Sequence, residues 1–222
     1  MMRAIGYFQS LPIHAAESLV DIELPIPTAT GHDLLVRVEA IAANPVDFKI
    51  RKNRAPQADK AEVLGWDAAG TVVAVGELVS LFKVGDPVFY AGALNRPGAN
   101  SEFHLVDERL VGAKPHNLSF ADAAALPLTA ITAWELLFDR LQLDLASPQF
   151  QQKVLLVSGA AGGVGSVLLQ LARQKTDAFI IGTASRPESQ AWVQQMGAHA
   201  VINHQLPLAE ELARLGIKQV SH

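Results

Sequence analysis

The stretch that decides the fold is Val154-Leu155-Leu156-Val157-Ser158-Gly159-Ala160-Ala161-Gly162-Gly163-Val164-Gly165. Its first four residues are all apolar and predict a buried β-strand, while the apolar-faced run Val164–Gln174 predicts a helix. The glycines lie between the two, where a dinucleotide-binding fold turns from strand to helix. A tight turn is the alternative explanation, but four glycines in seven residues exceed what a turn needs. The stretch therefore predicts a pyrophosphate site.

The loop can be aligned with the G-x-G-x-x-G pattern of such sites. The three glycine positions fall at Ala160, Gly162 and Gly165, so alanine replaces the first glycine. Gly162 is expected to let the backbone approach the pyrophosphate, and Gly165 to let the helix pack closely on its strand. Free N–H groups and the helix dipole favour the phosphates here. The predicted cofactor-binding residues of the loop are Ala160, Ala161, Gly162, Gly163, Val164 and Gly165.

Downstream of the loop, strand and helix patterns alternate. Strands are expected at Phe179–Thr183 and Ala200–Ile202, because both are short apolar runs. Helices are expected at Glu188–Met196, ended by Gly197, and at Leu208–Leu215, before Gly216. Buried strands joined by helices predict an α/β fold with a parallel, doubly wound sheet.

The C-terminal residues Val220-Ser221-His222 stand about where a fourth strand of that sheet is expected. Three strand–helix units make half of the usual six-stranded dinucleotide fold. A truncated polypeptide is expected rather than a minimal half-domain.

The end of the second strand indicates which dinucleotide binds. An NAD site places Asp or Glu there for the ribose hydroxyl, whereas this chain has Ser185-Arg186, and Arg186 lies 21 residues after Gly165. A guanidinium suits a 2′-phosphate in geometry and charge. Ser185 and Arg186 therefore predict NADPH. The alternatives are that Arg186 is a solvated residue at the start of a helix and that Glu188 is a late ribose ligand.

The first hundred residues have a different sequence pattern, of short strands separated by turns. Strands are expected at Leu34–Ala40 and Gly70–Gly76, and a Gly-Asp-Pro turn leads into a third strand within Lys83–Phe89. Frequent prolines divide this region into pieces too short for many helices, which predicts a compact β-rich domain.

The texture changes near residue 119. Ser119 is expected to cap a helix that has Asp122 at its third position, and Thr129–Leu141 shows apolar residues at helical spacing. A polar linker follows at Asp144–Gln152, with Pro148 inside it.

Composition sets limits on the class of protein. The 222 residues carry a net charge of −4, without the basic footprint that nucleic-acid binding usually shows. Cysteine is absent, so disulfides and thiolate metal sites are impossible. The first residues lack a signal-peptide pattern, and no uninterrupted apolar run reaches membrane-spanning length. We expect a soluble cytoplasmic protein that binds neither nucleic acid nor a membrane.

Four segments together resemble the medium-chain dehydrogenase/reductase superfamily, in its zinc-free quinone-oxidoreductase (zeta-crystallin-like) branch. They are Asn44–Asp47, Leu64–Val72, Leu126–Trp134 and the phosphate loop, and their order and spacing fit over essentially the whole chain. The resemblance implies a GroES-like catalytic domain at residues 1–125, then the first half of a Rossmann NADP-binding domain at 126–222. It further implies an active site in the cleft between them, a missing final segment, and a homodimer or higher homo-oligomer.

The zinc-ligand positions of the superfamily are altered in this chain. The first corresponds to Asn44, the histidine of a Gly-His-Glu element is replaced by Trp66, and the third position falls near Ala125. These residues cannot form a tetrahedral zinc site. The histidines offer no i,i+4 pair and are expected to be scattered surface or loop residues: His14, His32, His104, His116, His199, His204 and His222. We expect no metal.

The resemblance implies where catalysis takes place. Asn44 and Thr129 would lie beside the nicotinamide, Asn44 as a hydrogen-bond donor and Thr129 at the ribose or amide. A turn residue before Pro45 and a helix cap after Pro127 are the respective alternatives. Two aromatic residues, Phe48 and Tyr90, are candidates for pocket walls, with Tyr90 also a possible proton donor.

Two other residues complete this set of expectations. Asp47 is expected to tie a loop together. His204 ends the third strand and could flank the adenosine, although solvent exposure is equally expected.

The favoured function is NADPH-dependent reduction of quinones or α,β-unsaturated carbonyls without zinc. The cofactor supplies hydride, and hydrogen-bond donors or water stabilise the developing oxygen anion. The alternative is a truncated or decayed non-catalytic paralogue that keeps only partial nucleotide binding.

Overall fold

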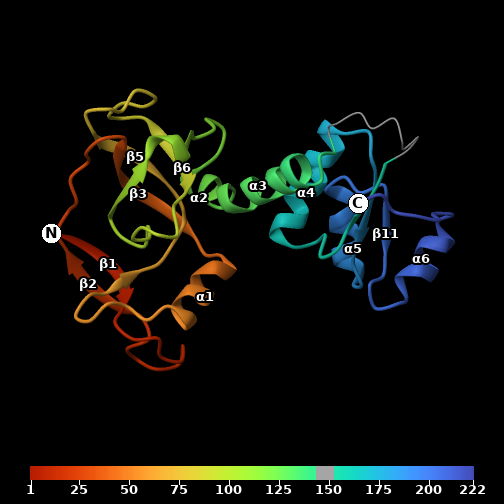
Figure 1. Ribbon diagram of the computed structural model, residues 1–222, viewed down its shortest axis with the longest axis horizontal. Helices are drawn as coiled ribbons and strands as arrows, with labels where there is room; N and C mark the ends of the chain where they lie inside the picture. The colour runs from red at the N-terminus through yellow and green to blue at the C-terminus, as the bar shows by residue number, and fades with distance from the viewer. Residues whose placement is uncertain (144–152) are drawn as a thin grey trace. The chain divides into compact units, whose positions relative to one another are not determined.

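The computed structural model describes residues 1–143 and 153–222, which form two compact units, Met1–Leu128 and Thr129–His222 (Figure 1). The sequence placed the boundary after residue 125. Leu128 belongs to the first unit, where its N–H donates to the carboxylate of Asp67. The expected linker Asp144–Gln152 lies outside the described residues.

The first unit contains two antiparallel sheets. The larger has the order β7-β3-β5-β6-β8 and the smaller β2-β1-β4. The predicted strands correspond to β3 (Asp33–Ala42), β5 (Asp67–Val75) and β6 (Pro87–Ala91). The remaining strands are β1 (Met2–Tyr7), β2 (Val20–Leu24), β4 (Glu62–Val63), β7 (Phe103–Asp107) and β8 (Val111–Ala113).

Alternating residues of the large sheet form the core of the first unit. Leu34 and Val36 of β3 are fully buried and pack with Ala68 and Val72 of β5. A smaller cluster joins Trp66 to Tyr7 and Leu64. The two clusters fix the segment around residues 64–68, which leads into β5.

The sequence did not anticipate helix α1 (Pro45–Asn53). Proline was expected to break helices in this region, but Pro45 occupies the first helical position. The missing N–H is not needed there, and the fixed φ of proline suits a helix start. Asn44 is the N-cap residue. A 3-10 turn, Glu108–Leu110, completes the helical segments of this region.

Three helical segments connect the units: α2 (Phe120–Ala124), α3 (Pro127–Trp134) and a π-helix, Glu135–Arg140. The Ser119 side chain accepts from the N–H of Asp122, as predicted. By length and composition alone, the stretch 120–140 could cross a membrane, contrary to the expectation that no segment would qualify. One such helix is weak evidence of a membrane span, and 28% of the window is buried in the structure.

The second unit is a parallel three-stranded sheet of order β11-β10-β9. Its strands are β9 (Val154–Val157), β10 (Phe179–Thr183) and β11 (Ala200–Ile202), and its helices are α4 (Gly163–Lys175), α5 (Pro187–Gln195) and α6 (Leu208–Arg214). Every one of these elements was predicted, with helix bounds shifted by one residue at most ends.

Both faces of this sheet are covered. One face packs against α4 and α5 through residues such as Leu155 and Ile180, and the other against α6 through Ile181 and Ile202 (Figure 1). The backbone of Ser221 and His222 bonds to Val154 and Leu156 beside β9. The resulting order is that of a doubly wound sheet, as predicted.

Candidate functional site

The glycine loop lies at the carboxyl end of β9. Gly159 has a φ of +67°, and its N–H donates to the Thr183 hydroxyl at 3.2 Å, which ties the loop to β10. Gly162 is the N-cap of α4, so the following amides have no partner within the helix. Ala161, Gly162 and Gly163 are exposed. The loop thus presents a helix N-terminus and free backbone N–H groups to solvent, an arrangement that suits an anion.

Two glycines allow close packing behind the loop. A β-carbon on Gly165 would lie 2.6 Å from the Gly159 oxygen, and one on Gly182 would lie 2.4 Å from Val193. Ala160 fills the space between loop and sheet, since it is fully buried and would lie 3.0 Å from a β-carbon on Gly182. Alanine at this motif position is therefore a packing residue.

Thr129 lies against the same loop. Its methyl carbon would be 3.2 Å from a β-carbon on Gly163, the first residue of α4. Thr129 is also half-buried in the first turn of α3. The contact places one predicted nicotinamide residue beside the predicted phosphate loop.

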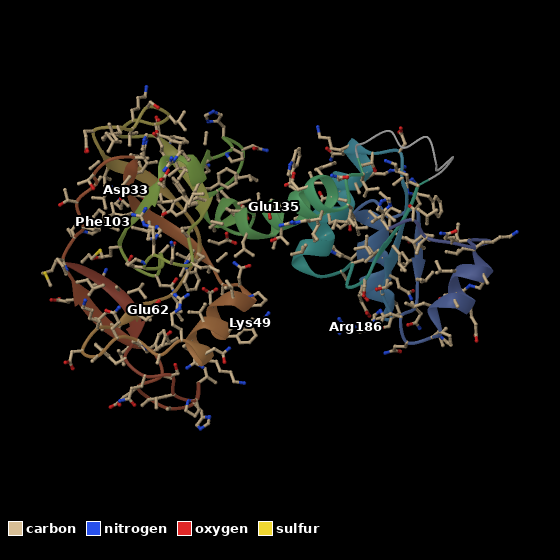
Figure 2. The ribbon with its side chains drawn as sticks, viewed as in Figure 1. Asp33, Lys49, Glu62, Phe103, Glu135 and Arg186 are labelled. Atoms are coloured by element: carbon tan, nitrogen blue, oxygen red, sulfur yellow. The ribbon has the colours of Figure 1, made fainter. Side chains whose placement is uncertain are left out.

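The end of β10 carries an unpaired cation. Ser185 is half-buried, and Arg186 is exposed at the start of α5 (Figure 2). The backbone of Arg186 bonds to the Ser189 hydroxyl, but within the described part of the chain its guanidinium has no hydrogen bond or ion pair. All its N–H groups are available to a ligand. His204 is exposed in the turn after β11 and stays a prediction.

A second cluster surrounds Asp67 in the first unit. Asp67 is fully buried at the start of β5. One carboxylate oxygen accepts from the Asn44 side-chain nitrogen at 2.8 Å, and the other accepts from the N–H of Leu128 at 2.8 Å. Burial raises the pKa of Asp67 to about 6, against the two hydrogen bonds, which lower it. Asp67 thus joins β5, the N-cap of α1 and the start of α3.

The Asn44 amide has a defined orientation. Its nitrogen donates to Asp67 and lies 3.4 Å from the Ala42 carbonyl oxygen. The expected role of Asn44 as a donor to substrate or cofactor is therefore corrected, because both N–H bonds already face protein acceptors. Its carbonyl oxygen is the atom left for a ligand.

Asp47 ties the loop together, as its position suggested. One oxygen accepts from the Asn44 N–H at 2.6 Å and the other from the Gly65 N–H at 3.1 Å. A carboxylate that accepts two backbone amides is a structural clamp.

Comparison with known proteins places this arrangement. Residues 30–126 match the alcohol dehydrogenase GroES-like domain. A putative zinc-dependent alcohol dehydrogenase from Rhizobium etli superposes with a TM-score of 0.94 at 55% identity, over 99% of this chain and 64% of that one. The chain belongs to the medium-chain dehydrogenase/reductase superfamily.

Other similar proteins are named for different activities. A zinc-type alcohol dehydrogenase-like protein from Staphylococcus aureus is 40% identical over 96% of this chain and 63% of its own length. An NADPH-dependent alkenal/one oxidoreductase from Arabidopsis thaliana is 35% identical over 87% and 50%. The Escherichia coli quinone oxidoreductase complexed with NADPH has a TM-score of 0.75 at 29% identity, over 98% and 64%. The chain spans about two thirds or less of these proteins.

In this chain, other residue types occupy the three zinc-ligand positions of the superfamily. Trp66 is 1% exposed, and its indole N–H donates to the Ala93 carbonyl at 3.1 Å. Ala125 offers only a methyl group, and the Asn44 nitrogen is bonded to Asp67. Within the described ranges, 1–143 and 153–222, no group of three His, Asp or Glu side chains could hold a metal ion.

The structure contradicts the role suggested for Tyr90. This residue is 1% exposed in the core of the large sheet, and its hydroxyl pairs with Nδ1 of His104 at 3.0 Å. Burial also raises the pKa of the Tyr90 hydroxyl far above its ordinary range. A group that is buried, bonded and weakly acidic cannot protonate a substrate. The alternating pattern of β6 turns the Tyr90 side chain into the core, so it does not form the pocket wall that was expected.

His104 corrects a second expectation, that the histidines are surface or loop residues. It lies in β7 at 5% exposure, and Nε2 bonds to the Pro97 carbonyl while Nδ1 faces Tyr90. Burial lowers the pKa of His104 to about 4, so the ring is neutral near pH 7. The Tyr90–His104 pair is part of the core.

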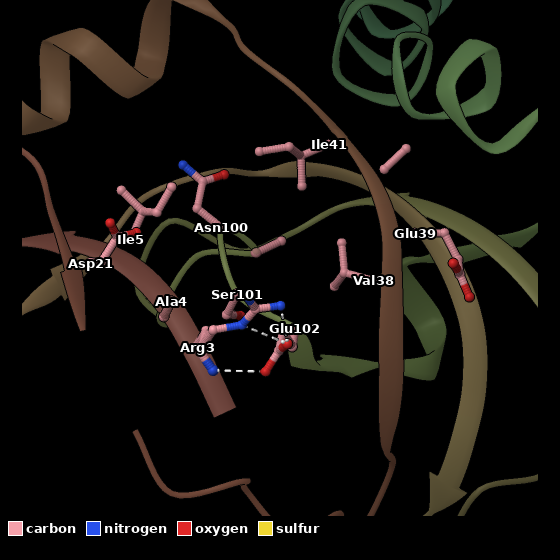
Figure 3. Close-up of a pocket in the computed structure, with 12 residues that line it drawn as sticks. Arg3, Ala4, Ile5, Asp21, Val38, Glu39, Ile41, Asn100, Ser101 and Glu102 are labelled. Atoms are coloured by element: carbon pink, nitrogen blue, oxygen red, sulfur yellow. Dashed lines mark hydrogen bonds and ion pairs between the residues drawn. The ribbon is translucent and has the colours of Figure 1, made fainter. Parts of the chain in front are cut away.

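Cavities within the first unit avoid most predicted site residues. One of about 360 Å³ lies between β1 and β3, beside the Arg3–Glu102 ion pair (Figure 3). None of the predicted site residues lines it. A cavity of about 220 Å³ is lined by Phe48, Asp47 and Arg51 of α1. Phe48 lines this cavity, and its expected place in the wall of the active-site pocket stays a prediction.

Proposed function

We propose that this chain is the nucleotide-binding and substrate-binding part of an NADPH-dependent oxidoreductase that reduces quinones or α,β-unsaturated carbonyls without zinc. The observation that carries the proposal is the exposed glycine loop at the start of α4, followed at the end of β10 by the unpaired Arg186. Quinone and alkenal oxidoreductases among the relatives support the reaction class.

The residues of the second unit fit a dinucleotide phosphate. The amides of Ala161 and of residues 163–165 would hold the pyrophosphate, because the helix N-terminus favours negative charge. The Gly162 N–H donates instead to the Gly159 carbonyl at 2.9 Å. Ser185 and Arg186 would hold the 2′-phosphate, the hydroxyl as a donor and the guanidinium as an opposite charge. The exposed acid Glu188 stands in the first turn of α5 and remains the competing ribose ligand. His204 is kept as a candidate at the adenosine end.

The side chains at the superfamily's zinc positions support the proposed zinc independence. A catalytic zinc needs three protein ligands and an open position. The side chains at the three superfamily positions are an amide bonded to Asp67, a buried indole and a methyl group. The indole and the methyl group offer zinc no ligand atom, and a single amide oxygen cannot replace three protein ligands.

The residues of the chain then have the task of positioning the cofactor and the substrate. When bound, NADPH supplies the hydride. Asp67 holds the Asn44 amide through its side-chain nitrogen, which fixes the orientation of that amide within the first unit. Thr129 lies against the phosphate loop and can bind the same cofactor. Since Tyr90 is buried, water supplies the proton.

Wider properties of the protein are proposed with the activity. A small-molecule substrate, a cytoplasmic location without nucleic-acid or membrane binding, and a homodimer or higher homo-oligomer fit this function.

The test is an assay of the 222-residue chain with NADPH and either a benzoquinone or an enone. We expect saturable consumption of NADPH that a zinc chelator leaves unchanged. Turnover that the chelator abolishes, or oxidation of ethanol, would contradict the proposal, and binding of NADPH without turnover would favour the non-catalytic alternative.

A further inference from the structure

Arg51 is a buried cation without a carboxylate partner. It lies in the last turn of α1 and is only 9% exposed. One Nη1–H donates to the Leu11 carbonyl at 2.6 Å, and across residues 1–143 and 153–222 the guanidinium makes no ion pair. Burying an unpaired charge is costly in free energy. Such a group has donors left for an anion.

The remaining N–H groups of Arg51 reach open space. In the described part of the chain, no fully buried side-chain nitrogen lacks a hydrogen-bond partner. A guanidinium has five N–H donors, and only one is used here. Arg51 lines the cavity of about 220 Å³, and the unused donors are therefore available to a molecule within it.

The rest of this cavity is largely apolar. Carbon side chains line it from the loop before β2, from the end of β3 and from α1, and several are strongly exposed to solvent: Ile13 at 65%, Phe48 at 57% and Ile41 at 47%. The other charged lining residue is Asp47. Its two oxygens accept backbone amides of Asn44 and Gly65, which partly neutralise its charge.

We propose that this cavity is a binding site for a small carboxylate with an apolar body. The carboxylate would pair with Arg51, whose planar fork matches two oxygens. The apolar body would cover Ile13, Ile41 and Phe48. An apolar cavity of about 150 Å³ holds benzene, so one of about 220 Å³ admits a molecule the size of benzoate. The cavity lies within the first unit, and the proposed binding of a carboxylate does not depend on the proposed reduction.

Benzoate is the probe, titrated into the 222-residue chain and followed by NMR, with benzamide as the uncharged isostere. We expect saturable binding of benzoate and at least tenfold weaker binding of benzamide, because the neutral amide cannot form charge-assisted hydrogen bonds with Arg51. Arg51→Met should weaken benzoate at least tenfold. Lys49→Met removes the same charge from an exposed position of the same helix (Figure 2) and should change the affinity less than twofold.

A second variant covers the case in which Arg51→Met does not fold. Phe48 is exposed and lines the cavity, so Phe48→Asp should fold and leave Arg51 in place. The added negative charge should lower the affinity for benzoate about tenfold. No saturable binding, equal affinity for benzamide, or equal losses in Lys49→Met and Arg51→Met would overturn the proposal.

Discussion

Asp67 is the residue that organises the first unit around the candidate site. Its partners, Asn44 and Leu128, are 23 and 61 positions away in the sequence. The motif Gly65-Trp66-Asp67 drew attention to Trp66 as a replaced zinc ligand, and the structure buries that indole. No local pattern could show that the next residue is a buried carboxylate, because its burial depends on long-range packing. The donor role of Asn44 failed for the same reason.

A charge swap tests the Asp67–Asn44 pair. In Asp67→Asn, the new amide oxygen must accept from the N–H of Leu128. The new amide nitrogen then faces the side-chain nitrogen of Asn44, so two donors oppose each other. We expect a loss of about 1–3 kcal/mol in unfolding free energy. Adding Asn44→Asp restores one donor and one acceptor, and should recover at least half of that loss. Urea unfolding at pH 7.5, where Asp67 is ionised, measures the cycle; strictly additive losses would contradict the pairing.

His104 gives a pH-dependent prediction. Its folded pKa of about 4 lies below the ordinary value of 6.5, so the unfolded chain binds the proton more readily. Stability from the neutral ring is present above pH 6.5 and is lost as pH falls toward 4, by about 3 kcal/mol in all.

The matched comparison for this prediction is His104→Gln. The advantage of wild type should shrink steadily from pH 7 to pH 4.5. Asp67 titrates in the same range with the opposite sign, since its pKa is raised, but it is present in both proteins and cancels. A constant difference across this pH range would show that His104 is not buried in its neutral form.

Elements of the second unit were predictable because their signals are local. Apolar runs, an intervening glycine loop, and Gly197 and Gly216 after two helices mark the strands and helices directly. Gly197 and Gly216 indeed have positive φ values of 113° and 73°. By contrast, β1 and β2 are defined by their pairing with each other, and α1 lies in a region whose frequent prolines predicted few helices. Such elements depend on tertiary partners that a sequence pattern does not display.

Two glycines in one turn of α4 provide an element-scale prediction. A β-carbon on Gly165 would meet the Gly159 oxygen and the Ala160 backbone at 2.6–2.7 Å, whereas one on Gly163 would meet only the Thr129 methyl at 3.2 Å. Gly165→Ala should lower the unfolding free energy by about 2 kcal/mol or more. Gly163→Ala should stay within about 1 kcal/mol of wild type, because alanine favours the helix. Equal effects in thermal or urea unfolding would refute the packing argument.

At the scale of the whole molecule, the sequence predicted a β-rich unit followed by a doubly wound one, and the superfamily to which they belong. Four motifs spread along the chain made this possible. The net charge of −4 argued against a nucleic-acid-binding protein, and the absence of cysteine excluded disulfides and thiolate metal sites. Cofactor choice rests on one exposed side chain, Arg186, whose partners would be ligand atoms. Its role therefore needs a binding measurement.

That measurement compares NADPH and NADH binding to the 222-residue chain by isothermal titration calorimetry. We predict that wild type prefers NADPH and that Arg186→Glu weakens NADPH at least tenfold more than NADH, because only NADPH carries the 2′-phosphate. Lys175→Glu, an exposed charge reversal at the far end of α4, should leave the preference unchanged. Equal losses for both nucleotides in Arg186→Glu, or no binding of either by wild type, would contradict the proposed NADPH site.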